Sequence, residues 1–343
     1  MYLFRNDYSE GAHPDVLAAL AKTNLEGIIG YGADDYCRRA ADLIRTLCEA
    51  PDARVEFLVG GTQTNFTAIA AFLRPWESVI TAGTGHVNGH EAGAVEATGH
   101  KLLLAPVGPE GKLCPADILP LVEEGRNEHV TKPRLVYISD ATETGSIYAK
   151  AELEALSACC RANDLLLFMD GARLGAAFAA ADNDLTLPDL ARLTDAFYIG
   201  GTKNGALMGE ALVISNTALQ NDFFRIKKQR GGVLAKGWLL GVQFDALLRD
   251  GLYWRIARNA VDCAQKLQRG LIELGFPMAN LSTTNQIFPI VPDALLPELN
   301  KLCAYEIWGR HDDTHTTVRF VTSFASSPDA MDAFLAEFKA LLA

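Results

Sequence analysis

The chain has 343 residues, of which 49% are hydrophobic and 21% are charged, and its formal net charge is −11. This composition is typical of a folded protein, and the acidic charge argues against a nucleic-acid or anionic-membrane partner, since such binding needs a basic surface. No apolar run is long enough to predict a membrane span and no signal peptide is visible at the N-terminus, so we expect a cytoplasmic protein with a small-molecule ligand.

Seven short apolar runs, separated by helical patterns, predict a mainly parallel sheet covered by helices. The runs are continuous rather than alternating, which is typical of strands buried on both faces. They span residues 55–59, 78–81, 101–104, 134–138, 165–169, 196–199 and 211–214. We therefore expect a large α/β domain over residues 1–245, including an N-terminal arm, with a seven-stranded sheet and with residues 150–162 as a crossover helix.

The pattern changes after about residue 245. An amphipathic segment at 254–274 predicts a long helix that stops before Gly275 and Pro277. Two apolar runs, 286–291 and 317–322, and a terminal helix opened by Ser327 follow. These elements predict a small α+β domain over residues 246–343.

Cysteine and histidine spacing indicates no metal centre. The seven cysteines are scattered and form no C-x-x-C pair, so we expect reduced packing residues rather than disulfides. His86, His90 and Glu91 lie close together in the sequence, but no other cluster completes a ligand set.

One lysine and one aspartate lie at the ends of predicted buried strands. Lys203 is in the segment 199–205 (IGGTKNG), and Asp170 opens the segment 170–173 (DGAR). Taken alone, Lys203 could be a surface loop residue and Asp170 could cap a helix. The carboxyl ends of neighbouring strands share one crevice, however, and an amine and a carboxylate there indicate pyridoxal phosphate, with a Schiff base on Lys203 and Asp170 near the pyridinium nitrogen.

Two further segments supply parts of such a site. Residues 60–65 (GGTQTN) follow a strand and open a helical pattern, so free backbone N–H groups could bind a phosphate, although glycines are also common turn residues at strand ends. His86 follows the strand 78–81 and could stack on a cofactor ring, move a proton, or simply pack in a loop.

Together these motifs resemble the low-specificity L-threonine aldolases, in the aldolase and β-eliminating lyase group of fold type I pyridoxal-phosphate enzymes. The similar segments occur in order along almost the whole chain, and the combination of DGARL with GGTKNG is the most specific part. They are 5–7 (RND), 31–32 (YG), 60–62 (GGT), His86 with 91–94 (EAGA), 170–174 (DGARL), 200–205 (GGTKNG) and 319–323 (RFVTS).

The resemblance implies roles for individual residues. The cofactor residues that it implies are Lys203 for the Schiff base, Asp170 for the ring nitrogen, His86 for stacking, and Gly61, Thr62 and Gln63 for the phosphate. Arg173 would contact the phenolic oxygen or the substrate carboxylate, and Arg319 would grip that carboxylate. Asn6 and Tyr31 would complete the substrate site.

The resemblance also implies an assembly. In the family the site lies between subunits of a homodimer, usually paired into a homotetramer, and a neighbouring subunit provides a basic residue for the phosphate. Lys236 is the best match for that residue in this chain, and Arg230 is the second.

Two positions depart from the family pattern. Glu143, in the segment 141–145 (ATETG), stands where many members have a histidine near the substrate hydroxyl, and Asn6 stands where many have serine. The base for the hydroxyl proton is therefore His86, Glu143 or a water between them.

The resemblance implies retro-aldol cleavage of a β-hydroxy-α-amino acid, from L-threonine or L-allo-threonine to glycine and acetaldehyde. The alternatives are β-elimination or another amino-acid lyase reaction on the same residues, and a cofactor-binding protein without turnover. Because Lys203 and Asp170 are both present, the last alternative is the weakest.

Overall fold

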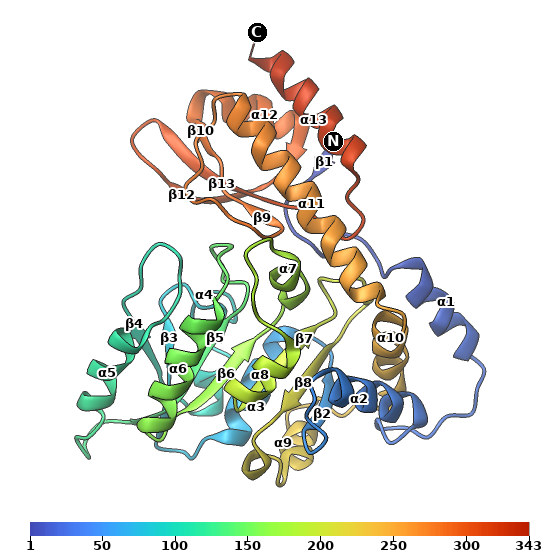
Figure 1. Cartoon of the computed structure of the whole chain (residues 1–343), viewed down its shortest axis with the longest axis vertical. Helices are drawn as coiled ribbons and strands as arrows, with labels where there is room; N and C mark the ends of the chain where they lie inside the picture. The colour runs from blue at the N-terminus through green and yellow to red at the C-terminus, as the bar shows by residue number, and fades with distance from the viewer. Residues whose placement is uncertain (343) are drawn as a thin grey trace.

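A seven-stranded sheet forms the centre of the larger part of the molecule in the computed structural model, which describes residues 1–342 (Figure 1). The strand order is β2-β8-β7-β6-β5-β3-β4, and β8 runs antiparallel to both of its neighbours while the other pairs are parallel. The strands are β2 (Arg54–Leu58), β3 (Glu77–Ala82), β4 (Leu102–Ala105), β5 (Lys132–Ser139), β6 (Leu166–Asp170), β7 (Ala196–Gly200) and β8 (Glu210–Ile214). All seven predicted strands, and the mainly parallel sheet, are confirmed.

The sheet is buried on both faces, which explains the continuous apolar runs. In β6, Leu167 and Met169 join one hydrophobic cluster, whereas Leu166 and Phe168 join another on the opposite face. Side chains of α2, α6, α8 and α10 cover the first face, and side chains of α3 and α9 cover the second. Figure 1 shows α6 and α8 lying in front of the sheet.

The helices of this larger part follow the strands as crossovers or flank the sheet. They are α1 (Pro14–Thr23), α2 (Asp35–Leu47), α3 (Gly61–Phe72), α4 (His86–Gly89), α5 (Pro115–Glu124), α6 (Lys150–Ala162), α7 (Leu174–Ala179), α8 (Leu187–Leu193), α9 (Phe223–Gln229) and α10 (Trp238–Leu248), with 3-10 turns at Glu96–Thr98 and Thr217–Leu219. The crossover helix predicted over 150–162 is therefore confirmed as α6.

Helix α11 (Leu252–Glu273) connects the larger part to a smaller α+β part (Figure 1). It matches the helix predicted over 254–274. The smaller part contains β9 (Gln286–Ile287), β10 (Ile290–Pro292), the 3-10 turn Asp293–Leu295, α12 (Leu296–Leu302), β11 (Cys303–Ala304), β12 (Glu306–Arg310), β13 (His315–Val321) and α13 (Pro328–Leu341). The apolar run 286–291 forms two short strands rather than one, with Phe288 and Pro289 between them.

The N-terminus lies against the smaller part. Strand β1 (Tyr2–Leu3) pairs in parallel with β11, and Phe4 packs in the same cluster as Phe320 and Phe334. Strands β9, β10, β12 and β13 form a four-stranded antiparallel sheet, the small sheet. The first residues of the chain thus run from the small sheet to the larger part. The expected boundary near residue 245 stays a prediction.

No helix within residues 1–342 has both the length and the apolar character that crossing a membrane requires.

Candidate active site

A pocket of about 300 Å³ lies at the carboxyl ends of β5, β6 and β7. The predicted site residues that line it are Gly61, Thr62, His86, Glu143, Asp170, Arg173 and Lys203. Parallel strands and their following loops bring these residues together from positions far apart in the sequence. The structure thus places seven of the predicted residues around one cavity.

Lys203 reaches the pocket from a tightly packed loop after β7. A Cβ atom at Gly200 would lie 2.4 Å from the Ala172 carbonyl oxygen, so the backbone before the lysine passes where only glycine fits. The amine forms no ion pair among residues 1–342, and its Nζ atom lies 6.0 Å from the centroid of the Tyr8 ring. Burial lowers the pKa of the Lys203 amine, and the nearby Arg173 charge lowers it further. Such an amine can lose its proton and act as a nucleophile.

Asp170 is buried at the end of β6 and accepts hydrogen bonds on both oxygens. The Tyr137 hydroxyl donates to Oδ2 at 2.5 Å, Asn65 Nδ2 donates to the same oxygen at 3.0 Å, and the Ala172 amide donates to Oδ1 at 2.9 Å. Burial alone would raise the pKa of Asp170, but the neighbouring His86 and the Tyr137 hydroxyl lower it below its ordinary value. This carboxylate is therefore suited to face a cationic ring.

His86 opens α4 and is held by a second buried carboxylate. Its Nδ1 atom lies 2.8 Å from Oε1 of Glu91, whose side chain has no exposed surface. Asn65 Nδ2 donates to the same Glu91 oxygen at 2.8 Å and also to Asp170. Because Nδ1 is engaged, Nε2 is the ring nitrogen left for a ligand in the pocket that His86 lines.

Glu143 lies directly beside His86. Its Oε1 atom accepts hydrogen bonds from the His86 amide at 2.9 Å and from the Ser139 hydroxyl at 2.8 Å. Burial raises the pKa of Glu143. The two residues that the sequence offered as the base therefore lie in contact at one wall of the pocket.

The first turn of α3 supplies an anion site at another wall. Its N-cap residue, Gly60, has no side chain to bond the free N–H groups, and the first helical residues Gly61 and Thr62 line the pocket. Backbone N–H groups and the helix dipole at such an end favour a phosphate. The Gln63 side chain points elsewhere, because its Nε2 donates to the Arg230 carbonyl at 3.3 Å.

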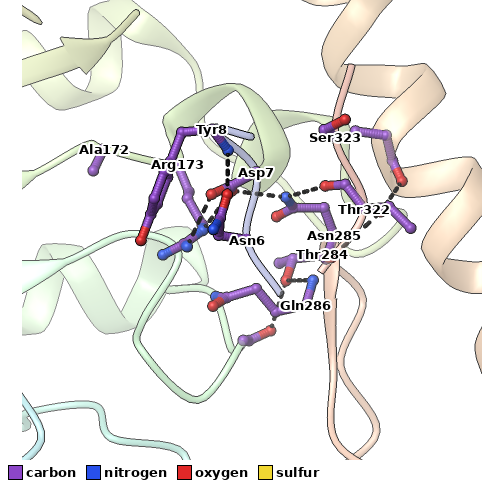
Figure 2. A network of polar contacts seen from close by, with 12 residues as sticks. Asn6, Asp7, Tyr8, Ala172, Arg173, Thr284, Asn285, Gln286, Thr322 and Ser323 are labelled. Atoms are coloured by element: carbon purple, nitrogen blue, oxygen red, sulfur yellow. Dashed lines mark hydrogen bonds and ion pairs between the residues drawn. The ribbon is translucent and has the colours of Figure 1, made fainter. Parts of the chain in front are cut away.

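Arg173 enters the pocket in a bidentate ion pair with Asp7 (Figure 2). Its Nε donates to Asp7 Oδ2 at 2.7 Å, and its Nη2 donates to Oδ1 at 3.1 Å. Both side chains are largely buried. The sequence analysis missed Asp7 as a partner, as it missed Asn65, Tyr137 and the contact of Glu91 with His86.

Besides Gln63, four predicted residues do not line this pocket. The Asn6 side chain accepts from the Tyr8 amide at 3.0 Å and so shapes the N-terminal arm. Arg319, on β13, pairs with Glu306 and lies over the Trp308 ring at 5.2 Å. Tyr31 and Lys236 belong to exposed loops that meet at the Tyr31 amide and the Ala235 carbonyl, 3.1 Å apart. Tyr31 lines a different pocket of about 350 Å³, beside α2.

The pocket residues fit pyridoxal phosphate. One cavity is lined by an amine of lowered pKa, a carboxylate of lowered pKa and an uncapped helix end. The amine suits the aldehyde of the cofactor, the carboxylate suits its ring nitrogen, and the helix end suits its phosphate. The fit rests on Lys203, Asp170 and the first turn of α3.

Known proteins of the same kind support this interpretation. The model for beta-eliminating lyases matches residues 4–294. A low-specificity L-threonine aldolase of a Pseudomonas species is 38% identical over 282 residues, which cover 80% of this chain and 81% of that protein. The corresponding Pseudomonas aeruginosa protein is 36% identical over 300 residues, which cover 87% and 84% of the two chains.

Solved structures show the same fold. A threonine aldolase from Leishmania major is 46% identical, with a TM-score of 0.98 over 100% of both chains. A Thermus thermophilus aspartate aminotransferase is 15% identical, with a TM-score of 0.74 over 99% of this chain and 91% of that one, and it shows the fold alone. The family implies pyridoxal phosphate as cofactor. This chain belongs to the beta-eliminating lyase family, among the low-specificity L-threonine aldolases.

Proposed function

We propose that this chain is a pyridoxal-phosphate-dependent carbon–carbon lyase that cleaves β-hydroxy-α-amino acids. L-threonine or L-allo-threonine would give glycine and acetaldehyde. The observation that carries the proposal is the convergence of Lys203, Asp170 and the first turn of α3 on one pocket, in a chain whose curated relatives are threonine aldolases. Cleavage removes the β-hydroxyl proton, breaks the Cα–Cβ bond and returns a proton to Cα.

Lys203, Asp170 and α3 form the cofactor-binding part of this proposal. Pyridoxal phosphate supplies, when bound, an aldehyde that condenses with amines and a cationic ring that withdraws electrons from Cα. Lys203 Nζ is the attachment point for the aldehyde, and Gly61 and Thr62 hold the phosphate with their N–H groups, with Gln63 in the same turn. Asp170 would hold the proton of the ring nitrogen, and His86 would stack on the ring.

The proton of the substrate hydroxyl goes to His86 Nε2 in this proposal. Glu91 holds Nδ1 of the same ring at 2.8 Å, so its negative charge faces the imidazole when the ring takes up a proton. Glu143 is the second candidate, because its carboxylate lies beside His86 and lines the same pocket. A correctly placed base contributes about 10²- to 10⁴-fold to the rate.

Arg173 and Arg319 bind the substrate carboxylate in this proposal. Arg173 already lines the pocket, whereas Arg319 comes from β13 and must release Glu306 to take part. Asn6 acts indirectly, by shaping the arm that carries Tyr8 into the pocket.

The proposed assembly is a homodimer or homotetramer with shared sites. Tyr31 and Lys236 are exposed on adjacent loops and do not line the pocket of their own chain. This placement supports a role in a neighbouring subunit's site, where Lys236 would contact the phosphate and Tyr31 the substrate. Arg230 lies in the same region, against Gln63.

A second reaction, β-elimination or another amino-acid lyase reaction, remains a candidate because the matching family is described as beta-eliminating lyases. Lys203 and Asp170 would serve either reaction, since neither residue determines which substrate bond breaks. The products separate the two reactions: cleavage gives an aldehyde and glycine, and elimination gives ammonia and a keto acid.

The test is an aldehyde assay on the purified protein with cofactor. L-threonine, L-allo-threonine and other β-hydroxy amino acids should release an aldehyde and glycine in equal amounts. Borohydride should fix the cofactor permanently on Lys203, as peptide mass spectrometry would show. Ammonia and a keto acid in place of aldehyde would establish the elimination reaction, and a protein that binds no cofactor would refute both.

A further inference from the structure

The N-terminal arm carries a buried carboxylate from the small sheet to the active-site pocket. The Phe4 amide donates to the Ala304 carbonyl at 2.8 Å, and the Val321 amide donates to the Phe4 carbonyl at 2.8 Å. Phe4 also packs against Phe320 at 5.4 Å between ring centroids. The arm is therefore anchored three residues before Asp7.

Asp7 accepts hydrogen bonds from both parts of the molecule (Figure 2). Besides the two bonds from Arg173, Asn285 Nδ2 donates to Asp7 Oδ2 at 3.0 Å and to the Thr322 carbonyl at 2.9 Å. Asn285 precedes β9 and Thr322 follows β13, so both belong to the smaller part. Asp7 is only 1% exposed, and the charge of Arg173 keeps its pKa below the ordinary value although burial alone would raise it. The carboxylate thus joins Arg173 to the small sheet as a charged, buried contact.

The contact determines which edge of the Arg173 guanidinium is free. Asp7 occupies the side that carries Nε and one hydrogen of Nη2. Within residues 1–342, Nη1 has no hydrogen-bond partner. The end of the group, with Nη1 and the second hydrogen of Nη2, therefore remains available to bind a carboxylate through two parallel bonds.

We propose that Asp7 is a positioning residue that holds Arg173 so that its free end receives the carboxylate of the amino-acid substrate. This inference rests on the proposed function, because that function supplies the carboxylate. The arginine side chain is long and flexible, and Glu143 in the same pocket is a competing acceptor. Without Asp7, Arg173 turns toward Glu143 and the carboxylate loses its preorganised partner.

Whether removal of Asp7 weakens or tightens the binding of a carboxylate distinguishes positioning of Arg173 from simple charge balance. If Asp7 only neutralised Arg173, its removal would leave a stronger positive charge and would tighten the binding of a carboxylate. If Asp7 positions Arg173, its removal weakens that binding. The Asp7→Asn variant, which keeps the size of the side chain and removes its charge, distinguishes the two.

The experiment is calorimetric titration of the holoenzyme with glycine and with glycinamide, which lacks the carboxylate. For Asp7→Asn we expect the glycine Kd to rise about 10- to 100-fold, the range for a lost charge-assisted contact, and the glycinamide Kd to change less than about twofold. Asn285→Ala, which keeps both charges and removes the link to Thr322, should weaken glycine binding in the same direction but less. The Asn285→Ala variant also tests the inference if Asp7→Asn does not fold.

The matched control is Asp245→Asn, a buried carboxylate on α10 that pairs with Arg249 away from the pocket. It should leave both Kd values unchanged. Unchanged or tighter glycine binding in Asp7→Asn, or equal weakening of glycine and glycinamide, would overturn the inference. Since the titration requires no cleavage, selective loss of glycine binding supports the role of Asp7 even if no amino acid releases an aldehyde.

Discussion

Replacing Glu91 by glutamine tests whether His86 takes the substrate proton. Glu91 Oε1 contacts His86 Nδ1 at 2.8 Å and accepts from Asn65 Nδ2 at 2.8 Å. Glutamine retains an oxygen that can accept both bonds, so the ring keeps its position. What the substitution removes is the negative charge beside an imidazole that becomes positive when it accepts a proton.

The size of the effect follows from the burial of Glu91. Its side chain has no exposed surface, whereas the His86 side chain is 33% exposed, so solvent screens the Glu91 charge from the imidazole only in part. A base contributes about 10²- to 10⁴-fold to the rate, and without the Glu91 charge His86 no longer stabilises the proton that it accepts, so we expect kcat to fall within this range while KM stays within about threefold. Glu91 Oε2 is buried without a partner, so the new amide would leave its N–H groups unsatisfied and lower the free energy of unfolding by about 1–3 kcal/mol.

The assay is acetaldehyde release from L-threonine over a range of substrate concentrations, with urea unfolding measured in parallel. Asp312→Asn is the control, because Asp312 makes a similar contact with His315, at 3.0 Å, in the exposed connection between β12 and β13. The control should turn over at the wild-type rate. If Glu91→Gln loses less than about tenfold in kcat, His86 is not the acceptor and the assignment to Nε2 is wrong.

Three further substitutions test other parts of the structure. Glu143→Gln keeps the acceptor that holds the His86 amide, so kcat should fall by about tenfold or less in the aldehyde assay, and a larger loss would make Glu143 itself the base. Gly200→Ala should lower the free energy of unfolding, measured with urea, by about 1–3 kcal/mol, because its Cβ would lie 2.4 Å from a backbone oxygen. Gly83→Ala serves as the control, because a Cβ at Gly83 meets nothing within 4 Å. Burial raises the pKa of Asp140 from the ordinary 3.8 to about 8. The protonated Asp140 carboxyl therefore contributes its full stabilisation below pH 3.8, and this stabilisation is lost as the pH rises through about 8. Asp140→Asn should therefore reduce the fall in the urea midpoint between about pH 5 and about pH 9, and an unchanged fall would show that Asp140 is ionised in the folded state.

The large sheet was predictable because its strands are buried on both faces. Runs such as 165–169 and 196–199 contain no polar alternation, and such runs are typical of parallel strands covered by helices. The small sheet was harder to predict. Strand β12 includes a glycine and exposed side chains, so it shows no continuous apolar run. The run 286–291 predicts one strand, but Pro289, which lacks a backbone N–H, lies between the two short strands β9 and β10 that form there.

The chemistry of the site was predictable only where it lies at strand ends. Lys203 and Asp170 follow apolar runs directly, so the topology brings them together. The residues that hold Asp170 in place come from elsewhere: Asn65 lies one turn into α3, and Tyr137 lies inside β5. Tyr137 is 33 residues from Asp170 in the sequence, and Asp7 is 166 residues from Arg173, so no local spacing indicates either contact.

The two arginines assigned to the substrate carboxylate differ in how firmly their present partners hold them. Arg173 pairs with Asp7, which is 1% exposed, and removing one member of such a buried pair costs about 3–5 kcal/mol. Arg319 pairs with Glu306, whose side chain is 44% exposed although that of Arg319 is 12% exposed, so water screens this pair more than it screens the buried pair of Arg173 and Asp7. A substrate carboxylate would therefore displace Glu306 from Arg319 at less cost than it would displace Asp7 from Arg173. In the proposed function, Arg173 is thus the more firmly fixed contact for the substrate carboxylate, and Arg319 is the more readily exchanged one.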